Sequence, residues 1–515
     1  MISFIQLFSA LRSRLFLVLL GISCELIYLL YFVRTFSVVT YGQSLNLIDL
    51  GAITHNSHTG FILFVMAFCI LFALVTLAWW EVRQEEAPDR TPFVLIFCFG
   101  AIFAFTMSFC YPVTAIDVFI YIAQSHVLVT HHANPLITPA ATFANDPLMT
   151  LAGQWGKSGA PYGPLGILVD AVPTLFAGRN VFLNLLLLKG MFSMMMLVCA
   201  WLVYSILAGG DKPQPLHIKR ALAGMLLFAW NPLVLFEYSA NSHNDVVIVL
   251  FVLLALFALT KEHPIVAFAL ILASASIKYA TLPLIPLFFL YGIMHQSNHR
   301  KRLIYLLWIA GVSVVFVGTV YGPFWAGPHM FDSTLSHDDW YLSSLSVVLS
   351  DITPLGLSGE RAKLVSRIIF GIFYLYALFL STKRLPDIIR GAALAMFGFL
   401  AFGTVKFEPW YAIWGLGLMV LVPSIEVSLA YIFFSLGATL IAPTFAFIWI
   451  WGGRTGSMFD GLNSLTYLMA FVPAQLVIFG WKLRQLLVKI QGKPPPMGSI
   501  AKNKASSHKT VSYTH

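Results

Sequence analysis

Residues 60–80 read GFILFVMAFCILFALVTLAWW and contain no charged side chain. A run of about 20 apolar residues is long enough for a helix to cross the hydrocarbon core of a bilayer. Comparable runs recur along all 515 residues, of which 59% are hydrophobic and 10% charged, whereas soluble proteins carry about 25% charged residues. The pattern predicts an all-α fold, built as one polytopic integral membrane bundle.

The apolar runs give 14 candidate spans, so we expect about 12–14 transmembrane helices. The runs are 15–33, 60–80, 93–110, 181–208, 221–236, 246–260, 265–277, 281–293, 303–321, 366–382, 391–405, 411–423, 428–451 and 463–482. The runs 265–277 and 281–293 are short, and they form either two short spans or one kinked, re-entrant element. The bundle is predicted to cover 15–482, between a cytoplasmic N-terminus at 1–14 and a basic, disordered cytoplasmic tail at 483–515.

The basic residues indicate how the bundle is oriented in a cell membrane. The formal net charge is +9, and the lysines and arginines gather in short loops and in the C-terminal tail. The positive-inside rule therefore predicts cytoplasmic termini. The long loops are then outside, at 34–59, 111–180, 237–245, 322–365, 406–410 and 452–462. The charges do not form a basic soluble module, so we expect no nucleic-acid partner, and the five cysteines lack metal-ligand spacing.

The first large outside loop, residues 111–180, has a structure of its own. Asp117, Tyr121 and Gln124 repeat at helical spacing between apolar residues, which predicts an amphipathic helix lying on the membrane surface. A second apolar stretch, residues 162–176, is interrupted by prolines and is predicted to be interfacial or re-entrant.

Asp117 is the first candidate for a chemical role. It comes just after a membrane-length apolar run, so its carboxylate lies at the boundary between membrane and water. Partial withdrawal from water is expected to raise its pKa, which would make it a better proton acceptor for a hydroxyl near neutral pH. The alternative is a structural role as a helix N-cap, because aspartate commonly begins helices.

A polar cluster lies in the predicted turn at 237–245. It reads Glu237-Tyr238-Ser239-Ala240-Asn241-Ser242-His243-Asn244-Asp245. Such polarity at a membrane boundary is unfavourable unless it faces water or a ligand, so His243, Asn244 and Asp245 are candidate binding residues. One alternative is an exposed turn in which Asp245 caps the next helix. His243 and Asp245 also suggest a divalent metal, but two ligands do not define a site.

Two further outside turns combine charge with aromatic rings. Lys278 and Tyr279 lie between two short apolar runs, where the cation either binds a lipid phosphate or extends to the membrane interface. The second turn reads Lys406-Phe407-Glu408-Pro409-Trp410-Tyr411. Its carboxylate and rings are typical of sugar-binding sites, and the alternative is an aromatic belt at the interface.

Other polar groups are weaker candidates, because most groups of this kind are solvated or structural. They are His126, His131, His132, Lys157 and Arg179 in the first large loop, His337-Asp338-Asp339-Trp340 in loop 322–365, and Glu25 within the first span.

In their order along the chain, these motifs resemble those of the GT-C glycosyltransferases, multi-span enzymes that use polyprenyl-phosphate sugars. The resemblance is greatest to the bacterial polyprenol-phosphate-mannose-dependent mannosyltransferases. The matching stretches are Asp117-Val118-Phe119-Ile120-Tyr121, Asn134-Pro135-Leu136, Pro161-Tyr162-Gly163-Pro164-Leu165, Asn231-Pro232-Leu233-Val234-Leu235-Phe236-Glu237, Asn241-Ser242-His243-Asn244-Asp245, Lys278-Tyr279 and Glu408-Pro409-Trp410-Tyr411.

The resemblance implies transfer of a hexose, mannose by default, from a polyprenyl-phosphate donor to a glycolipid or glycan acceptor. Transfer would occur on the extracytoplasmic face, with inversion, Asp117 as general base, and Lys278 and Tyr279 at the lipid phosphate. The residues implied to bind the substrates are Tyr121, Tyr162, His243, Asn244, Asp245, Glu408, Trp410 and Tyr411. No cofactor is firmly implied beyond the lipid-linked donor, and a divalent metal stays open.

Three other functions fit a polytopic chain. A polysaccharide polymerase or ligase shares the topology but moves whole lipid-linked oligosaccharides. A lipid or sugar transporter places charges along a path through the bilayer, whereas here they gather mostly on one face. A structural scaffold gives no reason for the outside carboxylates and lysine. We therefore favour an enzyme whose partners are membrane lipids, a lipid-linked donor and a glycan acceptor.

Overall fold

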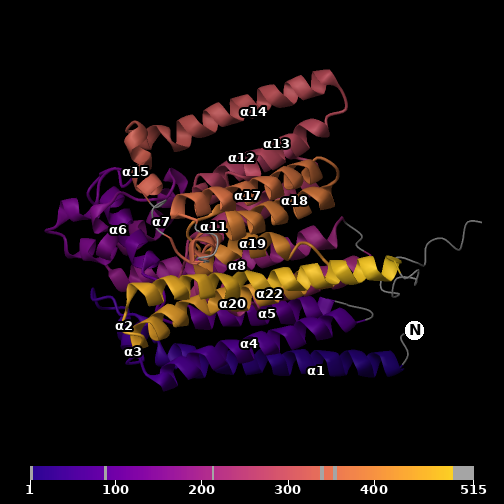
Figure 1. Ribbon diagram of the computed structural model, residues 1–515, viewed down its shortest axis with the longest axis horizontal. Coiled ribbons are helices and arrows are strands. Elements are labelled where there is room, and N and C mark those ends of the chain that lie inside the picture. Colours follow the sequence, from indigo (N-terminus) through magenta and orange to yellow (C-terminus); the bar gives the residue numbers. More distant parts are fainter. Residues whose placement is uncertain (1–3, 86–89, 211–213, 337–340, 352–356, 491–515) are drawn as a thin grey trace, which may run out of the picture.

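The computed structural model describes residues 4–85, 90–210, 214–336, 341–351 and 357–490. In these ranges the chain is a bundle of helices (Figure 1). The described residues form no strand, and they have two isolated backbone bridges, Ser37 with Cys110 and Leu342 with Lys406. The predicted all-α membrane bundle is confirmed.

Nine helices in the described ranges are long and apolar enough to cross a membrane. They are built on α1 (Phe4–Ile27), α4 (His58–Gln84), α5 (Arg90–Met107), α8 (Val181–Ala208), α14 (His299–Val320), α17 (Gly359–Ser381), α18 (Leu385–Gly398), α20 (Ile425–Thr439) and α22 (Gly456–Ile490). Three continue into π-helical turns, which are η1 (Tyr28–Val33), η10 (Phe399–Gly403) and η12 (Thr444–Trp449), the last after α21 (Ile441–Pro443).

One further pair of apolar helices is bent and would count as a tenth span if it crosses the membrane as a unit. Helix α9 (Pro215–Ala229) is followed by α10 (Pro232–Leu235) and the π-helix η4 (Phe236–Ala240), with an angle of 47° at the break. The break falls where Asn231 precedes Pro232, and the Asn231 side chain accepts hydrogen bonds from the amides of Leu233 and Val234. Pro232 cannot continue the hydrogen bonding of α9, so the chain starts a new helix at this point.

The remaining predicted spans are shorter helices. They are α11 (Asp245–Thr260), α12 (Pro264–Ala275), α13 (Leu284–Met294) and α19 (Ala412–Met419). The 14 predicted runs are thus all helical, but only nine, or ten with the bent pair, have the length of a span. Runs 265–277 and 281–293 are two separate helices, α12 and α13, joined by the 3-10 turn η5 (Tyr279–Thr281).

The first large loop folds into α6 (Asp117–Val129), η2 (Ala140–Phe143), η3 (Pro147–Lys157) and α7 (Pro164–Ala177). The predicted helix is present, but it does not lie on a surface, because every residue from Val118 to Val127 is buried. Helices α7 and α8 and the turn η3 pack around α6 and exclude solvent from its polar face as well. The expectation of an exposed amphipathic helix was therefore wrong for α6.

Short elements complete the chain. They are α2 (Val38–Tyr41), α3 (Leu50–Ile53), η6 (Gly322–Phe324), η7 (Pro328–Phe331), α15 (Asp332–Leu335), α16 (Leu345–Asp351) and η11 (Pro409–Tyr411). Helix α22 continues to Ile490 and so extends into the region predicted as a disordered tail from residue 483.

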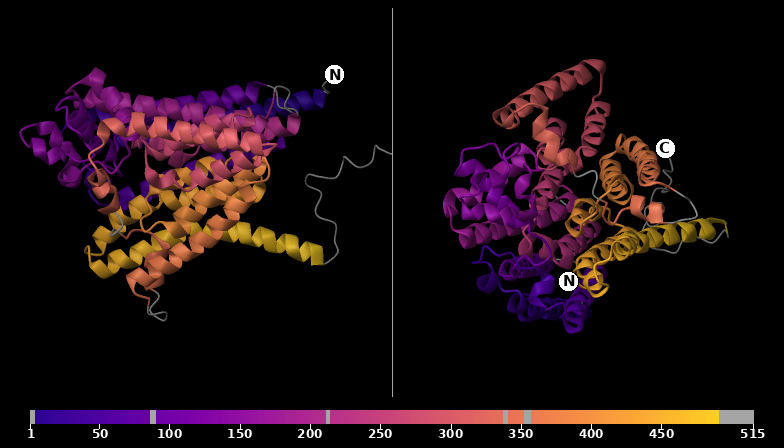
Figure 2. Two further views of the ribbon diagram at one scale, coloured as in Figure 1. Left: turned by 90° about the horizontal axis from the view of Figure 1, so that it is seen from above. Right: turned by 60° about the vertical axis from the view of Figure 1, so that its left-hand side comes forward.

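The two ends of the bundle differ. Figures 1 and 2 show the N-terminus and the far end of α22 at one end, and α6, α7 and α15 at the other. Helix α14 lies at the edge of the bundle in Figure 1, and apolar side chains such as Val314 of α14 (73% exposed) and Leu375 of α17 (67% exposed) are not covered by the bundle. An apolar surface of this kind is what a lipid environment requires.

Candidate functional site

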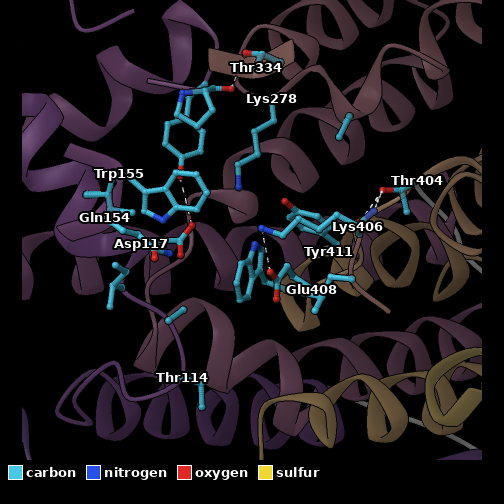
Figure 3. A pocket seen from close by; sticks show the side chains of 18 of the residues that line it. Thr114, Asp117, Gln154, Trp155, Lys278, Thr334, Thr404, Lys406, Glu408 and Tyr411 are labelled. Carbon is cyan, nitrogen blue, oxygen red and sulfur yellow. Dashed lines mark hydrogen bonds and ion pairs between the residues drawn. The ribbon is translucent and has the colours of Figure 1, made fainter. Parts of the chain in front are cut away.

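A cavity of about 1460 Å³ opens at the end of the bundle that carries α6 (Figure 3). Its wall comes from segments far apart in sequence, which the fold brings together around one space. Seven of the predicted site residues line it: Asp117, Tyr162, Lys278, Tyr279, Glu408, Trp410 and Tyr411. The other four, Tyr121, His243, Asn244 and Asp245, are buried behind this wall.

Asp117 is the first residue of α6, and its side chain is 20% exposed. Its Oδ1 accepts a hydrogen bond of 3.4 Å from the Tyr162 hydroxyl, and its Oδ2 lies 3.8 Å from Nε2 of His243. The N-cap position belongs to Ile116, so the Asp117 side chain does not serve as the cap of this helix. Its carboxylate faces the cavity instead (Figure 3).

The pKa of Asp117 differs from the expectation. Burial by itself would raise the pKa of this carboxyl, as predicted, but His243 and the charges of Lys278 and Lys406 outweigh burial and hold the pKa below its ordinary value. The prediction of a raised pKa was wrong because these cations come from distant segments of the chain. Asp117 is therefore ionised at neutral pH and ready to accept a proton.

The segment that carries His243 is fully buried instead of forming an exposed turn. Ser242, just before it, has a φ of 60°, which reverses the chain between η4 and α11. The ammonium group of Lys189 in α8 donates to the carbonyls of Ser239 (3.2 Å) and Ala240, which fixes the end of η4. These contacts place the imidazole directly behind Asp117.

His243 lies between two carboxylates. Its Nδ1 is 3.0 Å from Glu237 Oε2, and its ring stacks on Trp410 with centroids 4.2 Å apart. Burial would lower the pKa of His243, but Asp117 and Glu237 raise it to about 9. The imidazole is therefore positively charged at neutral pH.

Lys278 reaches the cavity from an extended residue between α12 and η5. Its Nζ lies 2.7 Å from Oδ2 of Asp245, which is fully buried at the start of α11, and Oδ1 accepts from the indole of Trp414 at 2.5 Å. The ammonium also lies over the ring of Tyr162, 5.2 Å from its centroid. Asp245 thus holds the lysine in place and does not act as a helix cap.

Lys406 and Glu408 form the opposite wall of the cavity (Figure 3). Lys406 Nζ lies 3.1 Å from Glu408 Oε1 and 5.8 Å from the ring centroid of Trp155. Burial raises the pKa of Glu408, and the nearby Lys406 opposes this rise. Tyr411 stacks on Trp414 at 4.3 Å, so this wall combines charge with flat aromatic surfaces.

A glycine turn joins the first large loop to the Lys278 segment. The amide of Gly163 donates to the carbonyl of Ile277 at 2.9 Å, and the amide of Leu165 donates to that of Ser276 at 3.1 Å. A Cβ atom at Gly163 would lie 2.1 Å from the Ser276 carbonyl oxygen, so only glycine fits this approach. The turn therefore sets the position of Tyr162 next to Lys278.

Two predicted residues support the wall from behind. Asn244 donates a hydrogen bond of 2.8 Å to Asp170 of α7. The ring of Tyr121 packs edge-on against Tyr162, with centroids 5.3 Å apart. Burial raises the pKa of Asp170 to about 8, so its carboxyl is largely protonated at neutral pH. In this structure neither Asn244 nor Tyr121 reaches the cavity.

The weaker candidates lie away from the cavity. His131 and Arg179 both contact Asp146, at 3.0 Å and 2.7 Å, and tie η3 to the end of α7. His126 is buried against Thr130, and Glu25 accepts a hydrogen bond from Thr106 in α5. His132 and Lys157 are not among the residues that line the cavity. The motif at 337–340 lies outside the described residues.

Among the residues that the structure describes, no group of three His, Cys, Asp or Glu side chains could hold a metal ion. His243 and Asp245 in particular do not form a pair. His243 contacts Asp117 and Glu237, whereas Asp245 contacts Lys278 and Trp414.

Several contributing residues were not assigned a role from sequence. Glu237 and Lys406 stood within the quoted motifs, and their charge next to predicted site residues was the available signal. Trp155 and Trp414 carried no such signal, because a single tryptophan in a loop or an apolar helix is common in membrane proteins. Only the fold shows that Trp155 faces Lys406 and that Trp414 donates to Asp245.

Comparison with known proteins agrees with the resemblance seen in the motifs. Over 190 residues the chain is 25% identical to alpha-(1->6)-mannopyranosyltransferase A of Corynebacterium glutamicum, an alignment that covers 37% of this chain and 37% of that relative. The family described as "Alpha-(1->6)-mannopyranosyltransferase, N-terminal domain" matches residues 27–294. The match takes in Asp117, His243 and Lys278 but not the wall at 406–414. Since it spans about half of the chain, the protein belongs to the alpha-(1->6)-mannopyranosyltransferase family.

Proposed function

We propose that this protein transfers a mannosyl residue from a polyprenyl-phosphate donor to a glycan or glycolipid acceptor. The acceptor hydroxyl gives its proton to Asp117, and its oxygen attacks the anomeric carbon of the donor. The bond from that carbon to the phosphate oxygen breaks, and polyprenyl phosphate leaves with the bonding electron pair. Attack opposite to the leaving group inverts the anomeric configuration.

The observation that carries the proposal is the ionised carboxylate of Asp117 on a cavity wall that also presents Lys278 and Lys406. A base for the acceptor and cations for an anionic donor thus share one space. Lys278 and Lys406 each have a carboxylate partner, at 2.7 Å and 3.1 Å, so the walls are pre-organised before a substrate binds. Trp155, Tyr162 and Tyr411 supply flat surfaces for sugar rings.

The size and place of the cavity suit a lipid-linked donor. A cavity of about 1460 Å³ exceeds the usual ~300–1,000 Å³ of small-ligand pockets, which leaves room for a donor sugar and an acceptor together. Helix α6, which carries Asp117 on the cavity wall, lies at the end of the bundle opposite the N-terminus (Figure 1). With that terminus in the cytoplasm, as the basic residues indicate, transfer takes place on the extracytoplasmic face of the cell membrane.

The test is sugar transfer by the purified protein in lipid. Labelled polyprenyl-phosphate mannose and labelled GDP-mannose are offered separately, each with a mannoside acceptor, to the wild type and to Asp117→Asn. We expect transfer from the lipid donor only, and its loss in the variant. Transfer from GDP-mannose alone would refute the proposal, because a nucleotide sugar is a cytoplasmic donor. If neither donor is used, polyprenyl-phosphate glucose, arabinose and galactose are offered next, and transfer from one of them would refute mannose but keep the reaction class.

A further inference from the structure

His243 has an environment that substrate binding does not explain. It is fully buried and does not line the cavity, so a sugar cannot touch it in this structure. Its two ring nitrogens lie near different carboxylates, Nδ1 at 3.0 Å from Glu237 and Nε2 at 3.8 Å from Asp117. The Trp410 ring covers one of its faces at 4.2 Å, and the imidazole is thus held on three sides.

The distribution of charge explains why a cation is needed at this position. Lys278 is paired with Asp245, and Lys406 is paired with Glu408. Asp117 and Glu237 are the two carboxylates that lie next to His243. Within the described part of the chain, the ion pair that each of them forms is with His243. A buried carboxylate without a cation is strongly destabilised, so these two require the imidazole in its charged form.

We propose that His243 is a positioning residue that acts as a fixed imidazolium, clamped by Glu237 and Trp410, and keeps the Asp117 carboxylate ionised and aimed at the acceptor hydroxyl. This inference rests on the proposed function, in which Asp117 is the general base. His243 itself takes no proton from the acceptor, because both of its nitrogens already carry one. Glu237 does not line the cavity, so in this proposal it acts on the reaction through His243.

The arrangement predicts two limbs in the pH dependence of transfer. Activity falls at low pH when Asp117 is protonated, and it falls at high pH as His243 loses its charge around its pKa of about 9. Other titratable groups face the same space, so the wild-type profile alone does not assign either limb. They are Asp49, Tyr162, Lys278, Tyr279, Tyr341, Lys406, Glu408 and Tyr411. Substitution of His243 or of its buried neighbour Glu237, neither of which lines the cavity, assigns each limb to a group.

Glu237→Gln is the main variant, because it keeps the shape of the side chain and removes one of the two charges next to His243. We expect the high-pH limb to move down by about 1 pH unit or more, since a nearby opposite charge shifts a pKa by about 1–3 units. His243→Gln should move the low-pH limb up and reduce kcat at least ~10-fold with little change in donor KM, because the base loses its orientation. Ser239→Ala, two residues from Glu237 on the same buried turn, is the matched control and should keep the wild-type profile.

Transfer by wild type from polyprenyl-phosphate mannose, and its loss in Asp117→Asn, are established first with the same preparation. If either fails, the proposed function is refuted, and the role of His243 falls with it. If both hold and folded Glu237→Gln keeps both limbs of the wild-type profile, the positioning role is wrong although the function stands. A shift in Ser239→Ala equal to that in Glu237→Gln would also overturn it, because the effect would then come from local packing.

Discussion

At the scale of single residues, the chemistry of Asp117 is set by neighbours that are distant in sequence. Burial favours its neutral form, but His243, Lys278 and Lys406 outweigh burial and keep it ionised. By lowering the pKa of Asp117, the cations also make its carboxylate a weaker base, whereas a raised pKa would have made it a stronger one. Its advantage is therefore its position and its charge at neutral pH, not high intrinsic basicity.

Asp117→Asn should lower kcat by about 10²–10⁴-fold, because the amide cannot accept the proton while it keeps the shape of the side chain. Asp117→Glu keeps the charge but moves it along the cavity, so an intermediate loss is expected. Turnover is measured with saturating lipid donor, and thermal unfolding confirms that each variant is folded. Near-normal turnover of Asp117→Asn would exclude it as the base.

Lys278 and Asp245 should be tested together, because each neutralises the other. Lys278→Met leaves Asp245 buried without a cation, which is expected to destabilise the protein by about 3–5 kcal/mol. The double variant Lys278→Met/Asp245→Asn should recover most of this stability, yet donor KM should remain raised by roughly 10–100-fold, as for loss of a hydrogen bond to a charged group. Recovery of wild-type KM in the double variant would show that Lys278 does not contact the donor phosphate.

At the scale of elements, the geometry of the site depends on contacts between the turns that connect the helices. The turn at Gly163 packs its backbone on Ser276 and Ile277, and thereby joins the first large loop to the residue before Lys278. The π-helix η4 and the left-handed Ser242 bring Glu237 and His243 onto one side of the chain. These irregular turns, not the regular helices, therefore set the positions of Lys278, Glu237 and His243.

Gly163→Ala should separate this turn from Ser276, because a Cβ atom would meet the Ser276 carbonyl oxygen at 2.1 Å. A displacement of about 1 Å at a catalytic site can reduce the rate by about 10²-fold, and we expect a loss of this order in kcat/KM. Gly156→Ala is the control in the same loop, since its Cβ would lie 3.5 Å from Ala152, an ordinary contact. Equal activities of the two variants would show that the close approach at Gly163 does not matter for function.

At the scale of the whole molecule, α6, which carries Asp117 on the cavity wall, lies at one end of the bundle, opposite the N-terminus and the far end of α22 (Figures 1 and 2). The exposed apolar sides of α14 and α17 agree with lipid on their outer faces. The direction of the bundle in the membrane then decides which compartment the cavity faces.

Single cysteines in a variant whose five native cysteines are replaced should report this direction. Cysteine replaces either Lys157, an exposed residue of η3, which packs on α6 at the cavity end of the bundle, or His299, an exposed residue at the start of α14, at the opposite end. In intact spheroplasts, a membrane-impermeant maleimide should label residue 157 and not residue 299. Labelling of 299 alone would place the cavity in the cytoplasm and contradict the proposed donor side.

The sequence by itself determined the class of fold and identified seven of the residues that line the cavity. Long apolar runs without a charge indicate helices in a membrane or in a protein core. Polar groups at a membrane boundary are unfavourable unless they face water or a ligand, and this identified Asp117, Lys278 and Glu408 as candidates. Only the tertiary structure decided how they act. It showed that Asp245 forms an ion pair with Lys278, that His243 lies behind Asp117, and that α6 is buried. Charge pairs between distant segments depend on distances of a few ångströms, which no local pattern in a sequence records.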